Sequence, residues 1–235
     1  MKRVVVLPVF NESPTLPAVL DGLAARSDVI IAVDDGSSDG SAGILRAWTE
    51  RSGKIVLISS DANHGKSRAL ELGFRRVLEM LERGSLDPGD LVITTDADGQ
   101  IPPSLIDEAC SSFEARGLDM LIGSRDFRLY PRTKRIGNAF MTWLASCLAG
   151  FPFQDTLCGF RILRAVAVAP ILEWYRARKY SCEQEISMIG VRLGLRTAND
   201  LIVPTVHYRS NSTWPDAVQI AWDSLRTWRR LRKIR

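Results

Sequence analysis

The sequence of 235 residues contains no apolar run of the length that a membrane-spanning helix needs, which is about 20 residues. Residues 141–153 are too few, and the stretch 162–172 is interrupted by Arg164 and Pro170. The N-terminus leads at once into a β-branched segment, Arg3–Leu7, so no cleavable signal segment is expected. These absences predict a chain that works in the cytoplasm without a membrane span.

Cysteine and histidine are scarce. The four cysteines form no Cys-x-x-Cys pair and stand far apart, at Cys110, Cys147, Cys158 and Cys182. This spacing predicts reduced thiols and argues against a structural zinc site. The only histidines, His64 and His207, have no carboxylate spaced with them, so we interpret them as ordinary polar or packed residues.

Excess charge is absent from most of the chain. Residues 216–235 hold six Lys or Arg and two acids, which accounts for the whole net charge of +4. No aromatic stacking platform or recognition motif accompanies this basic segment, so we expect no nucleic-acid partner.

What the sequence does contain is a regular alternation of short apolar runs and helix-compatible segments. The expected strands are Arg3–Leu7, Val29–Val33, Ile55–Ser59, Leu91–Thr95, Asp119–Gly123 and Leu201–Tyr208. The expected helices are Thr15–Leu23, Ala42–Glu50, Ser67–Leu81, Ser104–Arg116, Asn138–Leu148 and a segment from Cys182 to near Gly194, with a basic loop at 125–136. The alternation predicts an α/β fold with a mostly parallel central sheet flanked by helices, spanning residues 1–210 and followed by a basic amphipathic helix at 211–235.

Two carboxylates, Asp96 and Asp98, follow directly on the strand Leu91–Thr95. Ligands of open parallel sheets bind at the carboxyl ends of the strands. Paired acids there are suited to a Mg²⁺ or Mn²⁺ ion that also carries substrate phosphates. The alternative is a solvated turn, which the Asp-Gly pair by itself would favour.

Acidic and glycine-rich turns also follow the other early strands. Asp34 and Asp35 end the second strand, and Glu12 lies in the turn after the first. Gly65 and Lys66 open the third helix, where backbone N–H groups are available to an anion. Carboxylates gathered at one sheet edge bind either a metal or the donors of a base and a ribose.

Six motifs, in order, support a family assignment. They are PVFNE (8–12), VDDGSSDGS (33–41), NHGKSRAL (63–70), DADGQ (96–100), GSR (123–125) and DTLCGFR (155–161). Over about residues 3–209 the set resembles the family 2 glycosyltransferases of GT-A fold, and among them the dolichyl- and polyprenyl-phosphate hexose transferases.

The resemblance implies a role for each matching position. The nucleotide-sugar donor would contact Pro8, Phe10, Glu12, Val33, Asp35, Lys66, Ala97, Gln100 and Arg209. The Mg²⁺ or Mn²⁺ ligands would be Asp96, Asp98 and Gln100, and the residues of the reaction itself would be Asp98, Arg125, Arg135, Asp155 and Glu185. Arg125 and Arg135 would meet phosphates, and the family relation implies inversion at the anomeric carbon.

The acceptor decides whether a base is needed. A polyprenyl phosphate oxygen is already anionic at neutral pH, whereas a hydroxyl must lose its proton to a carboxylate, for which Asp155, Glu183 and Glu185 are the candidates. The family usually carries a Gly-x-Ser-Lys turn after its last strand, but residues 209–213 read Arg-Ser-Asn-Ser-Thr. Either Lys66, Lys179 or Arg209 compensates for the missing lysine, or the acceptor differs.

The C-terminal segment has an apolar face at helical spacing, formed by Val218, Ala221, Trp222, Leu225 and Trp228. Basic residues lie beside that face, namely Arg226, Arg229, Arg230 and Lys233. Tryptophan flanked by Arg and Lys is typical of a helix in an anionic headgroup layer, so we predict a peripheral protein on the cytoplasmic membrane face. The alternative is that the apolar face docks on the catalytic domain.

The sequence therefore favours a metal-dependent hexosyltransferase that acts on a polyprenyl phosphate. A transferase of the same fold that glycosylates a hydroxyl of a lipid, glycan or protein is the nearest alternative, and the missing lysine turn supports it. A sugar-1-phosphate nucleotidyltransferase would need a glycine-rich basic loop after the first strand, which PVFNES does not provide. A catalytically silent membrane scaffold would not need the Asp96 and Asp98 pair.

Overall fold

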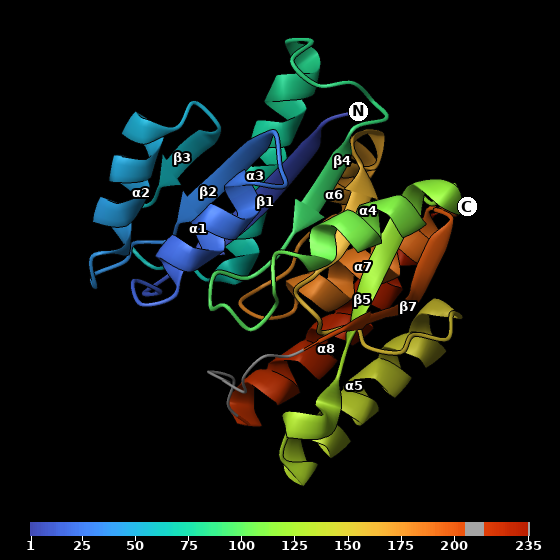
Figure 1. Cartoon of the computed structure of the whole chain (residues 1–235). Coiled ribbons are helices and arrows are strands. Elements are labelled where there is room, and N and C mark those ends of the chain that lie inside the picture. The colour runs from blue at the N-terminus through green and yellow to red at the C-terminus, as the bar shows by residue number, and fades with distance from the viewer. Residues whose placement is uncertain (205–213, 235) are drawn as a thin grey trace.

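The computed structural model describes residues 1–204 and 214–234, and it is built around one seven-stranded sheet (Figure 1). The strand order is β3-β2-β1-β4-β6-β5-β7. Their bounds are β1 Arg3–Val9, β2 Val29–Asp34, β3 Ile55–Ser59, β4 Leu91–Thr94, β5 Met120–Arg125, β6 Arg161–Arg164 and β7 Thr197–Val203. All pairs are parallel except those that β6 forms with β4 and β5. The mostly parallel α/β sheet expected from the sequence is confirmed.

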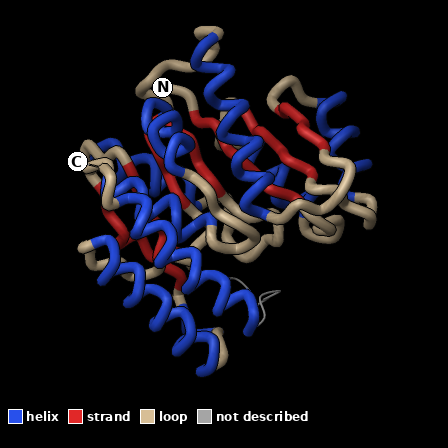
Figure 2. Tube along the Cα trace, turned by 180° about the vertical axis from the view of Figure 1, so that it is seen from behind, coloured by secondary structure: helices blue, strands red, loops and turns tan. Residues whose placement is uncertain are grey.

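Helices cover both faces of the sheet (Figure 2). They are α1 Leu16–Ala24, α2 Ser41–Arg51, α3 Lys66–Glu82, α4 Leu105–Ala115, α5 Arg132–Ala149, α6 Val168–Trp174, α7 Cys182–Arg192 and α8 Trp214–Leu231, with 3-10 turns η1 Phe127–Leu129 and η2 Ala165–Ala167. Side chains of a strand point alternately to opposite faces. In β1, therefore, Val5 and Leu7 pack with α1, α2 and α4, whereas Val4 and Val6 pack with α3 and the later helices.

The antiparallel strand β6 is not among the strands that the sequence predicted. Only Ile162 and Leu163 are apolar in this strand, and an arginine stands at each end. Arg161 is nonetheless fully buried, because its guanidinium donates to the carbonyl oxygens of Thr156 and Cys158 and to Ser187 Oγ. With a buried arginine among only four residues, this core strand lacks the hydrophobic pattern by which a strand is predicted from sequence.

Three further boundaries differ from expectation. The basic segment 125–136 is not a loop throughout, because α5 begins at Arg132, directly after Pro131, and arginine and lysine are good helix formers. The helix α6 was not expected. The edge strand β7 begins at Thr197 rather than Leu201, since its first half is polar, and 205–208 of the expected strand lie outside the described residues.

The C-terminal helix α8 packs against α5 and α7. Its buried residues are Ile220, Asp223, Ser224, Thr227 and Leu231, whereas Val218 and Trp222 are exposed. Docking on the domain, the alternative from the sequence, is thus realised, but mainly through residues outside the predicted apolar face, of which Trp228 packs against the core. In the described part of the chain no helix combines the length and apolarity that crossing a membrane would require.

Candidate active site

A cavity of about 600 Å³ opens where β1, β2 and β4 end. The parallel register brings these three carboxyl ends to one edge of the sheet, which is why motifs far apart in sequence meet there. The lining residues are Pro8, Val9, Phe10, Glu12, Asp35, Asn63, His64, Gly65, Lys66, Ala69, Asp96, Ala97, Asp98, Gln100, Arg125, Asn138, Leu157, Lys179, Tyr180, Glu183, Asp216 and Ile220.

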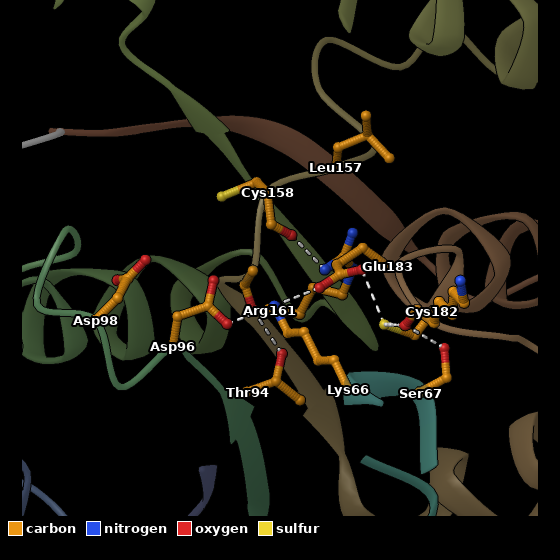
Figure 3. Close-up of polar contacts among 12 residues, drawn as sticks. Lys66, Ser67, Thr94, Asp96, Asp98, Leu157, Cys158, Arg161, Cys182 and Glu183 are labelled. Atoms are coloured by element: carbon orange, nitrogen blue, oxygen red, sulfur yellow. Dashed lines mark hydrogen bonds and ion pairs between the residues drawn. The ribbon is translucent and has the colours of Figure 1, made fainter. Parts of the chain in front are cut away.

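Lys66 lies between two carboxylates in this cavity (Figure 3). Its Nζ forms ion pairs with Asp96 Oδ1 and, at 2.5 Å, with Glu183 Oε1. Burial opposes the charge of Lys66, but Asp96 and Glu183 outweigh it and raise the pKa of the ammonium. Burial also disfavours ionised Glu183, yet Lys66 and Arg161 lower its pKa overall. The lysine that begins α3 is therefore a charged bridge between β4 and α7.

Burial dominates at Asp96, where it raises the pKa of the carboxyl although Lys66 opposes it. The backbone of the segment before β6 closes behind this side chain. Thr94 Oγ1 donates to the carbonyl oxygen of Gly159 at 2.9 Å. A Cβ built on Gly159 would lie 2.2 Å from Asp96 Oδ2, so only glycine leaves room for the carboxylate in its present position.

Asp98 is held by the residue that follows its turn. The backbone N–H of Gln100 donates to Asp98 Oδ1 at 3.0 Å, and the Gln100 amide donates to Asp98 Oδ2 at 2.5 Å. Thr15 Oγ1 donates to the carbonyl oxygen of Ala97 at 2.8 Å, which fixes the turn against the start of α1. The DADGQ segment is thus rigidly attached to the first helix of the domain.

The glycine turn before α3 binds an anion that the chain itself supplies. Backbone N–H groups of His64 and Gly65 donate to Asp35 Oδ1 and Oδ2 at 3.0 and 2.7 Å. The sequence predicted free N–H groups for a ligand at this turn, and these two are occupied by Asp35. Asp35 consequently links β2 to α3 while it lines the cavity.

Arg125 reaches the cavity from the end of β5 with a buried partner. Its Nε and NH2 donate to Asp155 Oδ2 and Oδ1 at 2.6 and 2.9 Å, a bidentate pair. Burial disfavours the charged guanidinium, but Asp155 more than compensates and raises its pKa. The guanidinium also lies over the rings of Phe127 and Tyr130, at 5.2 and 5.6 Å from their centroids. Asp155 is fully enclosed and orients the arginine.

Four of the residues singled out in the sequence do not line the cavity, and a fifth, Arg209, lies outside the described residues. Val33 is buried in the core beneath it. Asp155 is covered by Arg125. Arg135 Nε and NH2 donate to the carbonyl oxygens of Tyr130 and Arg128. Glu185 faces α8, where it accepts from Thr227 Oγ1 at 2.9 Å and from Arg230 NH2 at 2.7 Å.

The structure adds residues that no motif indicated. Asn138, Tyr180, Asp216 and Ile220 line the cavity from α5, the turn before α7 and α8. His64, interpreted from the sequence as an ordinary residue, lines it too. Lys179, one of the candidates to replace the missing lysine, also lines it and has a positive φ of 50°. Asn138, Tyr180, Asp216 and Ile220 could not be found from the sequence, because no local pattern shows which segments fold over the sheet edge.

The donor set suits a small divalent ion. Asp96 and Asp98 provide hard carboxylate oxygens in an open cavity, and Mg²⁺ typically takes only one or two protein carboxylates together with waters and substrate phosphates. Among the described residues no group of three or more His, Cys, Asp or Glu could enclose a metal. An ion bound here would therefore share its coordination with a ligand.

Comparison with known proteins identifies glycosyltransferases as similar to this chain. The family model described as "Glycosyl transferase family 2" matches residues 4–155. A UDP-N-acetylglucosamine–dolichyl-phosphate N-acetylglucosaminyltransferase of Methanococcus voltae is 27% identical over 203 residues, which cover 79% of this chain and 78% of that one. An undecaprenyl-phosphate 4-deoxy-4-formamido-L-arabinose transferase of Serratia proteamaculans is 42% identical over 175 residues, 72% of this chain. The matched region is 50% of that longer relative.

Solved structures agree on the fold. Mannosyl-3-phosphoglycerate synthase from Rubrobacter xylanophilus aligns with a TM-score of 0.67 at 23% identity, covering 99% of this chain and 74% of that one. Glucosyl-3-phosphoglycerate synthase from Mycobacterium tuberculosis, in complex with Mn²⁺ and UDP-glucose, aligns with a TM-score of 0.66 at 18% identity, covering 96% and 77%. The GT-A fold expected from the resemblance is confirmed.

Proposed function

Because the chain belongs to glycosyl transferase family 2, we propose that this glycosyltransferase moves a hexose from a nucleotide sugar to a polyprenyl phosphate, with inversion and with Mg²⁺ or Mn²⁺. One observation carries the proposal most: Asp96 and Asp98 share a single cavity with the cations Lys66, Arg125 and Lys179. Such a cavity matches a diphosphate that is bound jointly by a metal and by basic side chains. The same cavity favours a glycosyltransferase over the nucleotidyltransferase and the catalytically silent scaffold that the sequence left as alternatives.

The two carboxylates that follow β4, Asp96 and Asp98, would hold the ion, with Gln100 fixing the orientation of Asp98. When bound, a divalent ion supplies charge stabilisation to a leaving nucleoside diphosphate. Arg125 is pre-oriented by Asp155 and would contribute a further fixed positive charge at the same cavity. Phe10 and Asp35 lie on the wall formed by β1 and β2, where a base and ribose would be expected.

A phosphate acceptor fits the titratable groups of the cavity. Its attacking oxygen is already anionic, so no protein group has to remove a proton. Glu183 is paired with Lys66 and its pKa is lowered, which makes it a poor proton acceptor near neutral pH. The relatives from Methanococcus voltae and Serratia proteamaculans are named for dolichyl and undecaprenyl phosphate, which supports the same acceptor class.

The alternative acceptor is a hydroxyl group of a lipid, glycan or protein. Glu183 is the observation in its favour, because of the three candidate bases only Glu183 lines the cavity. Glu183→Gln would then abolish transfer and remove the acidic limb of the pH–rate profile, because a general base works only once it has lost its proton. With a phosphate acceptor the same variant would alter donor affinity through Lys66 and leave that limb in place.

The experiment supplies the purified chain with UDP- and GDP-linked radiolabelled hexoses, polyprenyl phosphate in detergent, and Mn²⁺ or EDTA. We expect label in the organic phase for one donor, lost with EDTA. Failure to label the lipid with any donor would refute the acceptor assignment. In a thermal-shift measurement, Asp98→Ala should remove the metal-dependent part of the nucleotide shift, and an unchanged shift would count against Asp98 as a ligand.

A lipid acceptor also requires the enzyme to reach a membrane surface. We propose that it is peripheral on the cytoplasmic face of the membrane and that its C-terminal helix contributes to attachment. Val218 and Trp222 are exposed on α8, and Arg226 lies over the Trp222 ring at 5.4 Å. At about 1 kcal/mol per basic residue near an anionic surface, the arginines of this helix would give appreciable affinity.

A further inference from the structure

A stripe of exposed apolar residues runs along α5. Ile136, Phe140, Trp143 and Cys147 follow one another at intervals of three or four residues, so they lie on one face of the helix. Ile136, Phe140 and Trp143 are 71%, 51% and 59% exposed, and the rings of Phe140 and Trp143 lie 5.8 Å apart. The opposite face of α5 packs into the protein. Large apolar side chains left together in water mark an interaction surface.

The neighbouring helix continues this surface. Val218 and Trp222, 58% and 49% exposed, lie on the outer face of α8, and Arg226 and Arg229 follow them at the same spacing. The two helices contact each other and lie side by side at the end of the molecule away from β3 and α2 (Figures 1 and 2). We call these outer faces of α5 and α8 the two-helix face.

The charge of this face has one sign. Residues 132–149 contain no Asp or Glu. Of the acids in α8, Asp216 lines the cavity and Asp223 is buried. Within the described residues of both helices, the exposed charged side chains are therefore all basic: Arg132, Arg135, Arg226 and Arg229. Arg232 and Lys233, directly after α8, are also exposed.

We propose that the two-helix face docks on an anionic lipid bilayer, with the α5 stripe of Ile136, Phe140 and Trp143 inserted into the headgroup region. Apolar side chains bordered by arginines, with no exposed acid among them, are complementary to lipid tails beneath anionic headgroups. A second copy of this chain is a poorer occupant, because its face would bring arginines against arginines. The inference rests on the peripheral attachment proposed above for α8 and deepens it, since it makes the α5 stripe the inserted part, at a surface apart from the cavity, for any acceptor.

The inner sides of the same helices form part of the cavity wall. Asn138 lines the cavity from α5, and Asp216 and Ile220 line it from α8. Docking through the outer side would therefore hold the cavity beside the headgroups rather than facing bulk water. The sequence predicted membrane contact for the basic C-terminal segment only, and not for α5.

Vesicle flotation with the full chain tests the proposal. Vesicles of neutral phosphatidylcholine alone, and of phosphatidylcholine with phosphatidylglycerol, are compared at low and high salt. The double variant Phe140→Ser/Trp143→Ser should lower partitioning to the anionic vesicles by about tenfold or more, because two aromatic side chains no longer bury apolar area. Arg229→Gln should lower it by about fivefold at low salt and much less at high salt, since salt screens exposed charges.

Val166 supplies the matched control. It is 59% exposed, like Trp143, but its N–H donates to the carbonyl oxygen of Pro88 before β4, at the edge of the sheet opposite the cavity. Val166→Ser should leave partitioning unchanged. Donor-nucleotide binding and the melting temperature of the double variant show that it is folded.

Two results would overturn the proposal. One is equal partitioning of the wild type and of the folded Phe140→Ser/Trp143→Ser variant. The other is a wild type that does not float with the anionic vesicles. If that wild type sediments as a dimer and the double variant as a monomer, the occupant of the face is a second copy. If the double variant loses vesicle binding but still transfers the sugar to a detergent-solubilised acceptor, the docking surface is supported independently of the proposed reaction.

Discussion

Gly159 offers the sharpest test of how the carboxylate pair is held. An ideal Cβ at this position would lie 2.2 Å from Asp96 Oδ2 and 2.7 Å from Asp96 Cγ, whereas real Cβ contacts almost never fall below 3.0 Å. In Gly159→Ala the Asp96 carboxylate must therefore retreat from the methyl group. The hydrogen bond from Thr94 Oγ1 to the Gly159 carbonyl oxygen restrains the backbone from moving instead.

The expected consequence is a loss of metal affinity. Mutating a residue that orients a metal-binding side chain typically lowers the metal affinity by about 10- to 100-fold. Because Gly159→Ala displaces the metal-binding carboxylate itself, we expect a loss of about 100-fold. Free Mn²⁺ gives an electron paramagnetic resonance signal that disappears on binding, so a titration with UDP or GDP present measures the affinity directly. Nucleotide binding without metal should change much less, because Phe10 and Asp35 lie elsewhere on the cavity wall.

Gly43 is the matched control. It lies inside α2, no atom would come within 4 Å of an added Cβ, and its φ is not positive. Gly43→Ala should leave Mn²⁺ binding unchanged and raise the free energy of unfolding by about 0.5–1 kcal/mol, since alanine loses less backbone freedom on folding. If Gly159→Ala is folded and binds Mn²⁺ as tightly as the wild type, the assignment of Asp96 as a constrained ligand is wrong.

Three further outcomes follow from the packing. Glu185→Ala should reduce the free energy of unfolding by about 1.5–3 kcal/mol, because buried hydrogen bonds from Thr227 and Arg230 are lost, with the turnover of the folded fraction retained; thermal denaturation and a rate per folded molecule check it. Gly73→Ala should destabilise the domain by about 1–3 kcal/mol in urea denaturation, since a Cβ would lie 2.3 Å from a methyl of β1. Burial raises the pKa of Cys158 to about 12, so its reactive thiolate form appears only near that pH; iodoacetamide at pH 8 should modify exposed Cys147 first and leave Cys158 intact, as peptide mass mapping would show.

The first half of the fold could be predicted from sequence because each strand and helix there has a recognisable pattern in its own residues. β3 spans Ile55–Ser59 as expected, and the other early strands and helices differ from their predicted bounds by one or two residues. Short β-branched runs ended by Gly, Pro or Asp require only local physics to recognise. The carboxyl ends of these strands then had to meet, so the cavity and the position of Asp96 and Asp98 followed from topology.

The later half depends on partners far away in the chain. Arg161 lies in a core strand only because Ser187 on α7 and two carbonyl oxygens accept its hydrogen bonds. The buried face of α8 is likewise polar: Ser224 accepts from the Gln184 amide at 2.6 Å, and Asp223 accepts from Ser181 Oγ at 3.2 Å. Hydrophobic periodicity does not detect such satisfied polar interfaces, so the sequence did not indicate the face by which α8 packs against the domain.

Glu183 and Glu185 show why a motif match alone does not tell which of two nearby acids faces the cavity. The two acids are two positions apart on α7, and side chains at that spacing point to different sides of a helix. Glu183 turns to the cavity and pairs with Lys66, while Glu185 turns to α8 and pairs with Arg230. One turn of α7 thus joins the cavity to the helix whose outer face we assign to the bilayer. Because these two contacts use different side chains of that turn, Glu185→Ala is expected to weaken the packing of α8 and to leave the Lys66–Glu183 ion pair in place.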